Sequence, residues 1–80
     1  MNLQLIQGQF SAGDAIDILT KMVEVKIKFH EAKILSQLNE EDIKMRENRI
    51  KQLQKELVEI RNFITSKEAK IEIRSLVQVE

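Results

Sequence analysis

Residues 43–64 of this chain read IKMRENRIKQLQKELVEIRNFI, and this stretch decides the fold. Its apolar residues recur in two interleaved series, each with a step of seven: Ile43, Ile50, Leu57 and Ile64, and Leu53 and Ile60. A repeat with a mean spacing near 3.5 residues places these side chains in one narrow seam on a helix. Asn39 is a suitable N-cap residue, and acids follow it where the first turn of a helix favours negative charge. We therefore predict a helix over residues 40–64 that lies against one other helix.

The preceding residues predict a second helix, over residues 12–36, with a wider apolar surface. Ser11 is a suitable N-cap residue, and Asp14 follows at the third helical position. At about 100° per residue the apolar positions divide into two sub-faces. The first sub-face holds Ile16, Leu19, Val23, Ile27, His30 and Ile34, and the second holds Ile18, Met22, Val25 and Phe29. An ordinary surface helix has one apolar stripe, so this helix needs two different partners.

Short alternating segments flank the two helices. Residues 2–7 read as a strand that Gly8 ends, and residues 70–79 alternate between apolar and polar side chains. A short link around Leu38 makes the two helices antiparallel neighbours, so the hairpin returns the chain to its starting end. We predict a single α+β domain over residues 1–80, in the order β-α-α-β. In it a long antiparallel helical hairpin packs on a two-stranded antiparallel sheet.

The size of the chain argues for self-association. A domain of 80 residues buries only about 60% of its unfolded surface and is marginally stable without further support. Disulfides are excluded because the chain has no cysteine, and one histidine is a poor basis for a structural metal. We therefore predict a homodimer that joins through strand edges or through the remaining apolar side of the first helix.

The charges are balanced locally as well as overall. Residues 11–37 carry four acids and four bases, residues 38–65 carry six of each, and residues 66–80 carry three of each. Nucleic-acid binders usually concentrate basic charge, so a nucleic-acid partner is disfavoured. The first ten residues contain no Lys or Arg, and no stretch approaches the roughly 20 apolar residues of a membrane span. The sequence predicts a cytoplasmic protein with no membrane contact.

His30 is the residue that first invites a catalytic interpretation. It lies on an apolar sub-face, without a second histidine, a cysteine or H-E-x-x-H spacing, which favours a packing or interface role. Lys26 and Lys33 border the two sub-faces, where they either cover apolar surface with their stems or contact acids of a partner. We predict no enzyme activity, no metal and no cofactor. The expected interface residues are Met22, Val25, Lys26, Phe29, His30 and Lys33.

The first half of the chain resembles a group of small bacterial proteins of unknown function. The resemblance rests on a leading strand that feeds a long helix, and on the run Phe29-His-Glu-Ala-Lys33 near the end of that helix. Such proteins carry a similar F-H-E-x-K run. The resemblance implies a bacterial or mobile-element origin, and no activity or residue role follows from it.

Two classes of function remain open from the sequence. The first is a small interaction or structural protein without chemistry, which acts as a homo-oligomer or binds an unidentified protein partner. The second is a nucleic-acid-associated regulator, of the repressor or antitoxin type, since short strands and helical dimers occur among such proteins. In the second case a dimer would have to gather bases such as Lys67, Lys70 and Arg74 on one surface.

Overall fold

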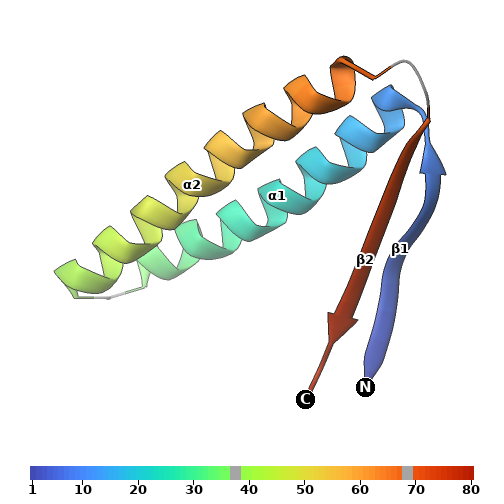
Figure 1. The fold of residues 1–80 in the computed structure, drawn as a ribbon. Coiled ribbons are helices and arrows are strands. Elements are labelled where there is room, and N and C mark those ends of the chain that lie inside the picture. The colour runs from blue at the N-terminus through green and yellow to red at the C-terminus, as the bar shows by residue number, and fades with distance from the viewer. Residues whose placement is uncertain (37–38, 68–69) are drawn as a thin grey trace.

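The computed structural model describes residues 1–36, 39–67 and 70–80 of the chain. The elements are β1 (Asn2–Phe10), α1 (Ala12–Leu35), α2 (Glu40–Thr65) and β2 (Ile71–Gln78), as Figure 1 shows. The helices form an antiparallel hairpin, and β1 pairs with β2 in a two-stranded antiparallel sheet. The predicted β-α-α-β fold is therefore confirmed, whereas the link expected around Leu38 lies outside the described residues.

Both helices begin at the capping residues that the sequence indicates. The Ser11 Oγ accepts a hydrogen bond from the Asp14 amide at 3.1 Å, and the Asn39 Oδ1 accepts one from the Asp42 amide at 2.9 Å. Each bond satisfies a backbone donor that the first turn of a helix cannot pair internally. The predicted ends differ from the observed ones by one residue: α1 ends at Leu35, with Ser36 as its C-cap, and α2 extends to Thr65.

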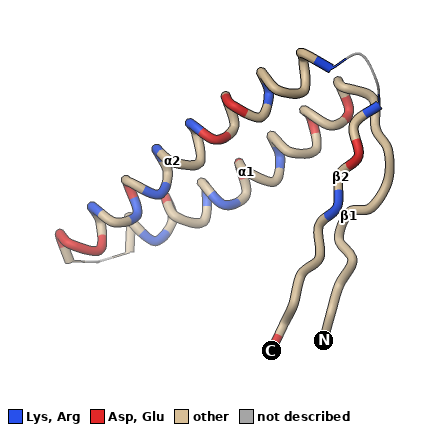
Figure 2. The backbone as a smooth tube through the Cα atoms, in the orientation of Figure 1, with Lys and Arg blue, Asp and Glu red and all other residues tan. Residues whose placement is uncertain are grey.

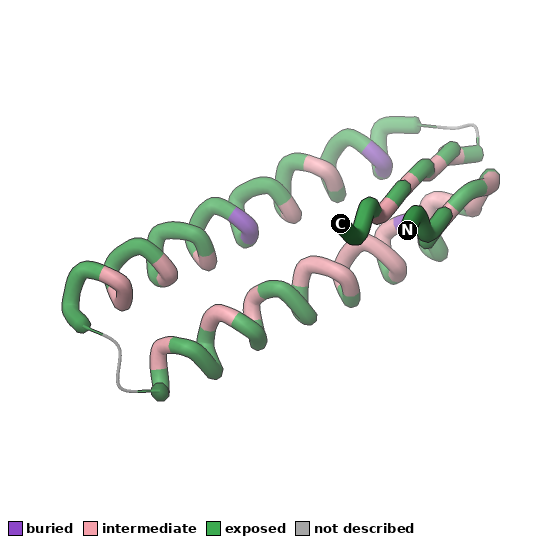
Figure 3. Tube along the Cα trace, turned by 90° about the horizontal axis from the view of Figure 1, so that it is seen from below, coloured by how far each residue is buried: buried purple, intermediate pink, exposed green. Residues whose placement is uncertain are grey.

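The apolar seam of α2 faces α1 along the hairpin. Leu53 and Ile64 are buried in it, and the remaining apolar seam residues are half-buried. Ala15, in the first turn of α1 after β1, is the third buried residue among those described. Figure 3 shows exposed and half-buried positions along most of both helices and both strands. Most of the described chain is exposed or half-buried, because two helices cover only one side of each other.

The strand β1 is longer than predicted. It was expected to end at residue 7, but its pairing with β2 continues as far as Phe10, which lies opposite Ile71. The pairing also shifts by one residue between Gln4 and Ile6. The shift leaves Leu5 as the extra residue of a β-bulge, which interrupts the alternation of side chains. Leu3 pairs with Val77 before the bulge and Ile6 pairs with Ser75 after it, so both stay on the face that β2 turns toward the helices.

Gly8 continues the strand that it was expected to end. Its φ angle is +155°, a conformation that residues with a side chain rarely adopt, and it pairs with Ile73. A Cβ atom added at this position would lie 3.9 Å from the ring of Phe10. The glycine therefore allows a backbone conformation that other residues rarely adopt, and β1 continues through it to Phe10.

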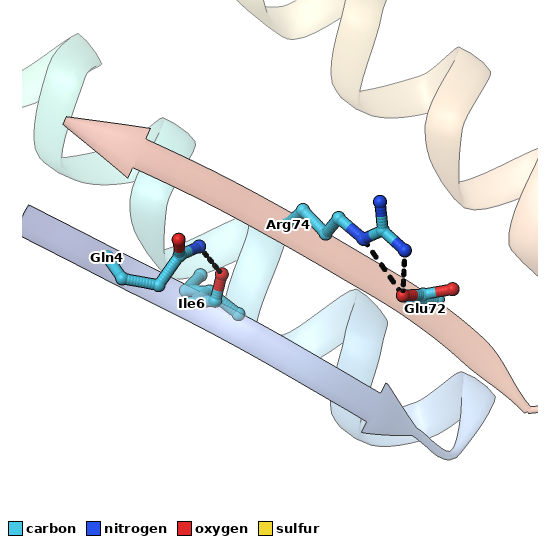
Figure 4. A network of polar contacts seen from close by, with 4 residues as sticks. All are labelled: Gln4, Ile6, Glu72 and Arg74. Carbon is cyan, nitrogen blue, oxygen red and sulfur yellow. Dashed lines mark hydrogen bonds and ion pairs between the residues drawn. The ribbon is translucent and has the colours of Figure 1, made fainter.

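Polar side chains of the ribbon make hydrogen bonds and an ion pair within the ribbon itself. The Gln4 side-chain amide donates to the backbone oxygen of Ile6 at 3.0 Å and to that of Ser75 at 3.2 Å, across the bulge. On β2, Arg74 and Glu72 form an ion pair at 2.8 Å (Figure 4). The two Gln4 bonds join carbonyl groups on both sides of the bulge, and the Arg74–Glu72 pair joins two side chains of β2.

The molecule is flat and open. The ribbon leaves one end of the helical hairpin at an angle, and the two termini lie together at its far end (Figure 1). The radius of gyration is 15.2 Å, whereas a compact domain of this length has about 12 Å. The accessible surface is 6508 Å², against about 5,000 Å² for a folded monomer of the same mass. One chain therefore leaves an unusually large surface uncovered.

Candidate functional site

The second apolar sub-face of α1 is covered only near the start of the helix. Ala15 is fully buried on that side, and Ile18 and Met22 are half-buried. Further along, the exposed fraction reaches 68% for Val25 and 55% for Phe29. The ribbon thus covers the first turns of this sub-face, and its angle to the hairpin leaves the later turns open.

An apolar cavity of about 510 Å³ lies where the ribbon and the hairpin diverge. It brings three of the predicted interface residues, Met22, Val25 and Lys26, beside Leu5 of the bulge and Glu56 of α2. Sequence reasoning missed Leu5 as a lining residue because strict alternation does not show where a bulge turns a side chain. It missed Glu56 because that residue comes from the other helix.

The aromatic ring of Phe29 lies close to two cations, one from each helix. The Nζ of Lys33 lies 5.6 Å from the centre of the Phe29 ring, and the Cζ of Arg46 lies 5.7 Å from it. The His30 ring meets the Phe29 ring edge to face, with centres 5.9 Å apart. Cations over an aromatic face are attracted by its quadrupole. The structure therefore places His30 and Lys33 beside the ring of Phe29, and all three belong to the predicted interface residues.

His30 binds Arg46 across the hairpin. The Nη1 of Arg46 lies 3.0 Å from the Nδ1 of His30, and because a guanidinium can only donate, the imidazole nitrogen accepts. Burial lowers the pKa of His30 below its ordinary value of 6.5, and the charges of Arg46, Arg49 and Lys26 lower it further. The hydrogen bond and the local charge both favour the neutral ring, which fits the predicted packing role.

Arg46 is a residue of the candidate site that the sequence did not lead us to expect. It precedes Leu53 by seven residues, so it occupies a position of the apolar seam itself. Its Nε atom is buried and has no hydrogen-bond partner within the described ranges. A charged residue in the seam, together with a histidine on the facing sub-face of α1, was the sequence signal for this contact.

The bases of both helices form a cationic cluster, defined here as Lys26, Arg46 and Arg49 around His30. An open groove of about 710 Å³ lies beside this cluster, lined by His30, Met45, Arg46, Asn48, Arg49 and Gln52. Basic positions of α1 and α2 lie side by side in the half of the hairpin away from the ribbon (Figure 2). The ion pairs within the described residues are Lys21–Asp17 and Arg74–Glu72, so neither neutralises the cluster.

The described residues hold no candidate metal site and no helix that could span a membrane. Among residues 1–36, 39–67 and 70–80, no group of three His, Cys, Asp or Glu side chains is placed to hold a metal ion. Within the same residues, neither helix is both long and apolar enough to cross a membrane. Comparisons with protein-family models, with curated proteins and with solved structures found no match to this chain.

Proposed function

We propose that this chain is a small non-enzymatic interaction protein that acts as a homo-oligomer through its helices and its strand edges. The observation that carries the proposal is the excess of exposed surface. One chain exposes 6508 Å², about 1,500 Å² more than a folded monomer of its mass. A standard protein interface covers about 800 Å² on each partner, so association with a second copy would cover about half of this excess.

The distribution of exposed apolar side chains supports the same proposal. Val25 and Phe29 of α1 and Met45 and Phe63 of α2 are all more than half exposed. Val25 and Phe29 lie four residues apart on one side of α1, and an exposed apolar patch of this kind is typical of a contact with another protein. The ribbon adds two outer strand edges whose backbone groups are open to pairing.

The arrangement around His30 supports a contact role rather than catalysis. Its near neighbours on both helices are Lys26, Arg46 and Arg49, and its Nδ1 already accepts a hydrogen bond from Arg46. A general base is usually oriented by an acidic group and faces a nucleophile or a substrate. A neutral imidazole among cations instead fits a polar contact that aligns the two helices.

Sedimentation equilibrium over a concentration series from about 1 to 200 µM tests the proposal, with circular dichroism recorded on the same samples. We expect a mass of at least twice 9.4 kDa at the upper concentrations. We also expect the melting temperature to rise with concentration, because association stabilises the folded state by mass action. A folded species of 9.4 kDa throughout the series would refute the proposal.

The cationic cluster favours a second candidate function, a nucleic-acid-associated regulator. Lys26, Arg46 and Arg49 come together beside an exposed aromatic ring, Phe29, and basic and aromatic groups together bind nucleic acid strands. Fluorescence anisotropy with labelled DNA and RNA, at several salt concentrations, tests this candidate. Phosphate contacts require an affinity that falls steeply with salt and that Arg49→Ala weakens more than Lys51→Ala.

A further inference from the structure

A second stripe of side chains runs along α2 beside the seam that faces α1. It consists of Met45, Arg49, Gln52, Glu56 and Phe63, which follow one another at steps of four, three, four and seven residues. Residues at these steps lie above one another on a single side of a helix. The sequence analysis gave α2 one partner, and this stripe gives it a surface for another.

The two grooves beside α2 confirm that this stripe is open to solvent. Met45, Arg49 and Gln52 line the groove of about 710 Å³, and Glu56 and Phe63 line a neighbouring groove of about 350 Å³. Met45 and Phe63, at the two ends of the stripe, are 58% and 55% exposed. The stripe therefore has apolar ends and a polar centre.

The charges of the stripe are complementary to those of the same stripe on a second, antiparallel copy of the chain. Arg49 and Glu56 are seven residues apart, about 10 Å along the helix, which is too far for an ion pair within one chain. The Glu56 carboxylate accepts a hydrogen bond from Gln52 at 3.0 Å, and neither Arg49 nor Glu56 takes part in an ion pair of the described residues. Arg49 and Glu56 can therefore each form an ion pair with a residue of opposite charge on another chain.

We propose that a second copy of this chain docks antiparallel along this stripe of α2, about a twofold axis that passes beside Gln52. The axis places Arg49 of each copy opposite Glu56 of the other, and Met45 of each copy near Phe63 of the other. Two equivalent ion pairs form in one contact, as a twofold interface requires. This inference rests on the proposed homo-oligomeric function, and it names the surface and the geometry.

The same docking neutralises part of the cationic cluster. Arg49 is one of the three bases around His30, and in one chain the described ion pairs leave it without a carboxylate. Glu56 of the second copy supplies that carboxylate beside the His30–Arg46 contact. Like charges that repel one another in a single chain thus attract the carboxylate of an antiparallel second copy, which favours this contact over others.

Charge reversal provides the first test, by sedimentation equilibrium of purified full-length chains. Arg49→Glu and Glu56→Arg, made singly, each turn two attractions into two repulsions, and we expect the dimer dissociation constant to rise about 30-fold or more. The double variant R49E/E56R exchanges the charges and should return to within about threefold of the parent. Lys55→Glu and Glu47→Arg, singly and together, make the same charge changes outside the stripe and should have little effect.

A single cysteine provides a second test that does not depend on variants that alter charge. The parent has no cysteine, so Gln52→Cys places one thiol per chain beside the proposed axis. Oxidation should link two chains, because a disulfide needs Cα atoms within about 7 Å. Gln54→Cys, on another side of α2, is the matched control and should stay uncrosslinked under the same oxidant.

The outcomes separate this inference from the proposed function. Rescue by the double charge exchange and selective crosslinking at residue 52 support the antiparallel stripe contact. A stable dimer that ignores both charge reversals and crosslinks equally at residues 52 and 54 overturns the inference and leaves the homo-oligomer in place. A parent chain that is monomeric at every concentration overturns both.

Discussion

The two ends of the helical hairpin differ in how far they are closed. At the ribbon end, Ala15 of α1 and Ile64 of α2 are fully enclosed where the helices meet the strands. At the turn end, His30 and Arg46 occupy the corresponding inward positions, and Phe29 stays exposed. The seam is therefore closed by apolar side chains at the ribbon end, whereas toward the turn end a polar pair interrupts it between Ile43 and Ile50, which are half-buried.

The largest effect that separates the two ends should come from Ile64→Ala. Ile64 is 1% exposed, so its truncation leaves a cavity and should lower the free energy of unfolding by about 2–5 kcal/mol. Leu35→Ala is the matched control at the turn end, where the side chain is exposed, and should cost no more than about 0.5 kcal/mol. Urea denaturation followed by circular dichroism measures both. Equal losses would mean that the ribbon end is not the core.

Two glycines close to the ribbon end should respond to alanine with opposite signs. Gly8→Ala puts a side chain on a residue with φ of +155° and should destabilise the fold by about 1–2 kcal/mol. Gly13→Ala lies in α1 with no atom near the added methyl group, and should stabilise the fold by about 0.5–1 kcal/mol. Thermal melts of the two variants check the signs. A neutral Gly8→Ala would show that β1 does not need its unusual backbone there.

The two helix caps offer a finer comparison of the ends. Ser11 and Asn39 make equivalent hydrogen bonds, to the amides of Asp14 and Asp42. Ser11→Ala should lower stability by about 1 kcal/mol, because the first turn of α1 is held between the ribbon and α2. Asn39→Ala should cost less, because the first turn of α2 can fray without opening a buried site. Hydrogen exchange at the amides of residues 14 and 42 would show the difference locally.

The smallest expected effect is a pH dependence at the turn end. The pKa of His30 is lowered in the folded chain by burial and by Arg46, Arg49 and Lys26, so the unfolded chain binds its proton more tightly. The stability that this neutral ring contributes is therefore complete above the ordinary pKa of about 6.5 and is lost as the pH falls below it.

The measurement is a set of urea denaturation curves between pH 5 and pH 8, for the parent and for His30→Gln. We expect the parent to lose stability toward pH 5 by more than the variant does, because glutamine does not titrate. Parallel profiles for the two proteins would show that the His30–Arg46 hydrogen bond does not influence stability.

Local sequence signals account for most of the secondary structure. The seven-residue repeat correctly predicted α2. The capping residues Ser11 and Asn39 correctly predicted that the two helices start at residues 12 and 40. These signals act over three to seven residues, so they can be recognised without knowledge of the fold. The alternation of residues 70–79 likewise predicted β2, which spans Ile71–Gln78. The same rule failed in β1, because a bulge at Leu5 changes the alternation partway along the strand.

The candidate surface was predicted in part. The six residues named on α1, from Met22 to Lys33, lie where the ribbon leaves that helix open or half-covered. Their neighbours on α2, above all Arg46 and Arg49, were not named, because the charge of each segment was counted separately. Segment sums are balanced, but the antiparallel hairpin sets bases of α2 beside Lys26 and His30.

The sequence by itself determined the two helices, their caps, the second strand and the order β-α-α-β, because these depend on residues close together in the chain. Only the tertiary structure decided the angle at which the ribbon leaves the hairpin, the register of β1 and the cationic cluster. Those features depend on which distant residues meet: Ser75 opposite the bulge, and Arg46 against His30. A pairing between distant residues is set by the packing of whole elements, and no local pattern encodes it.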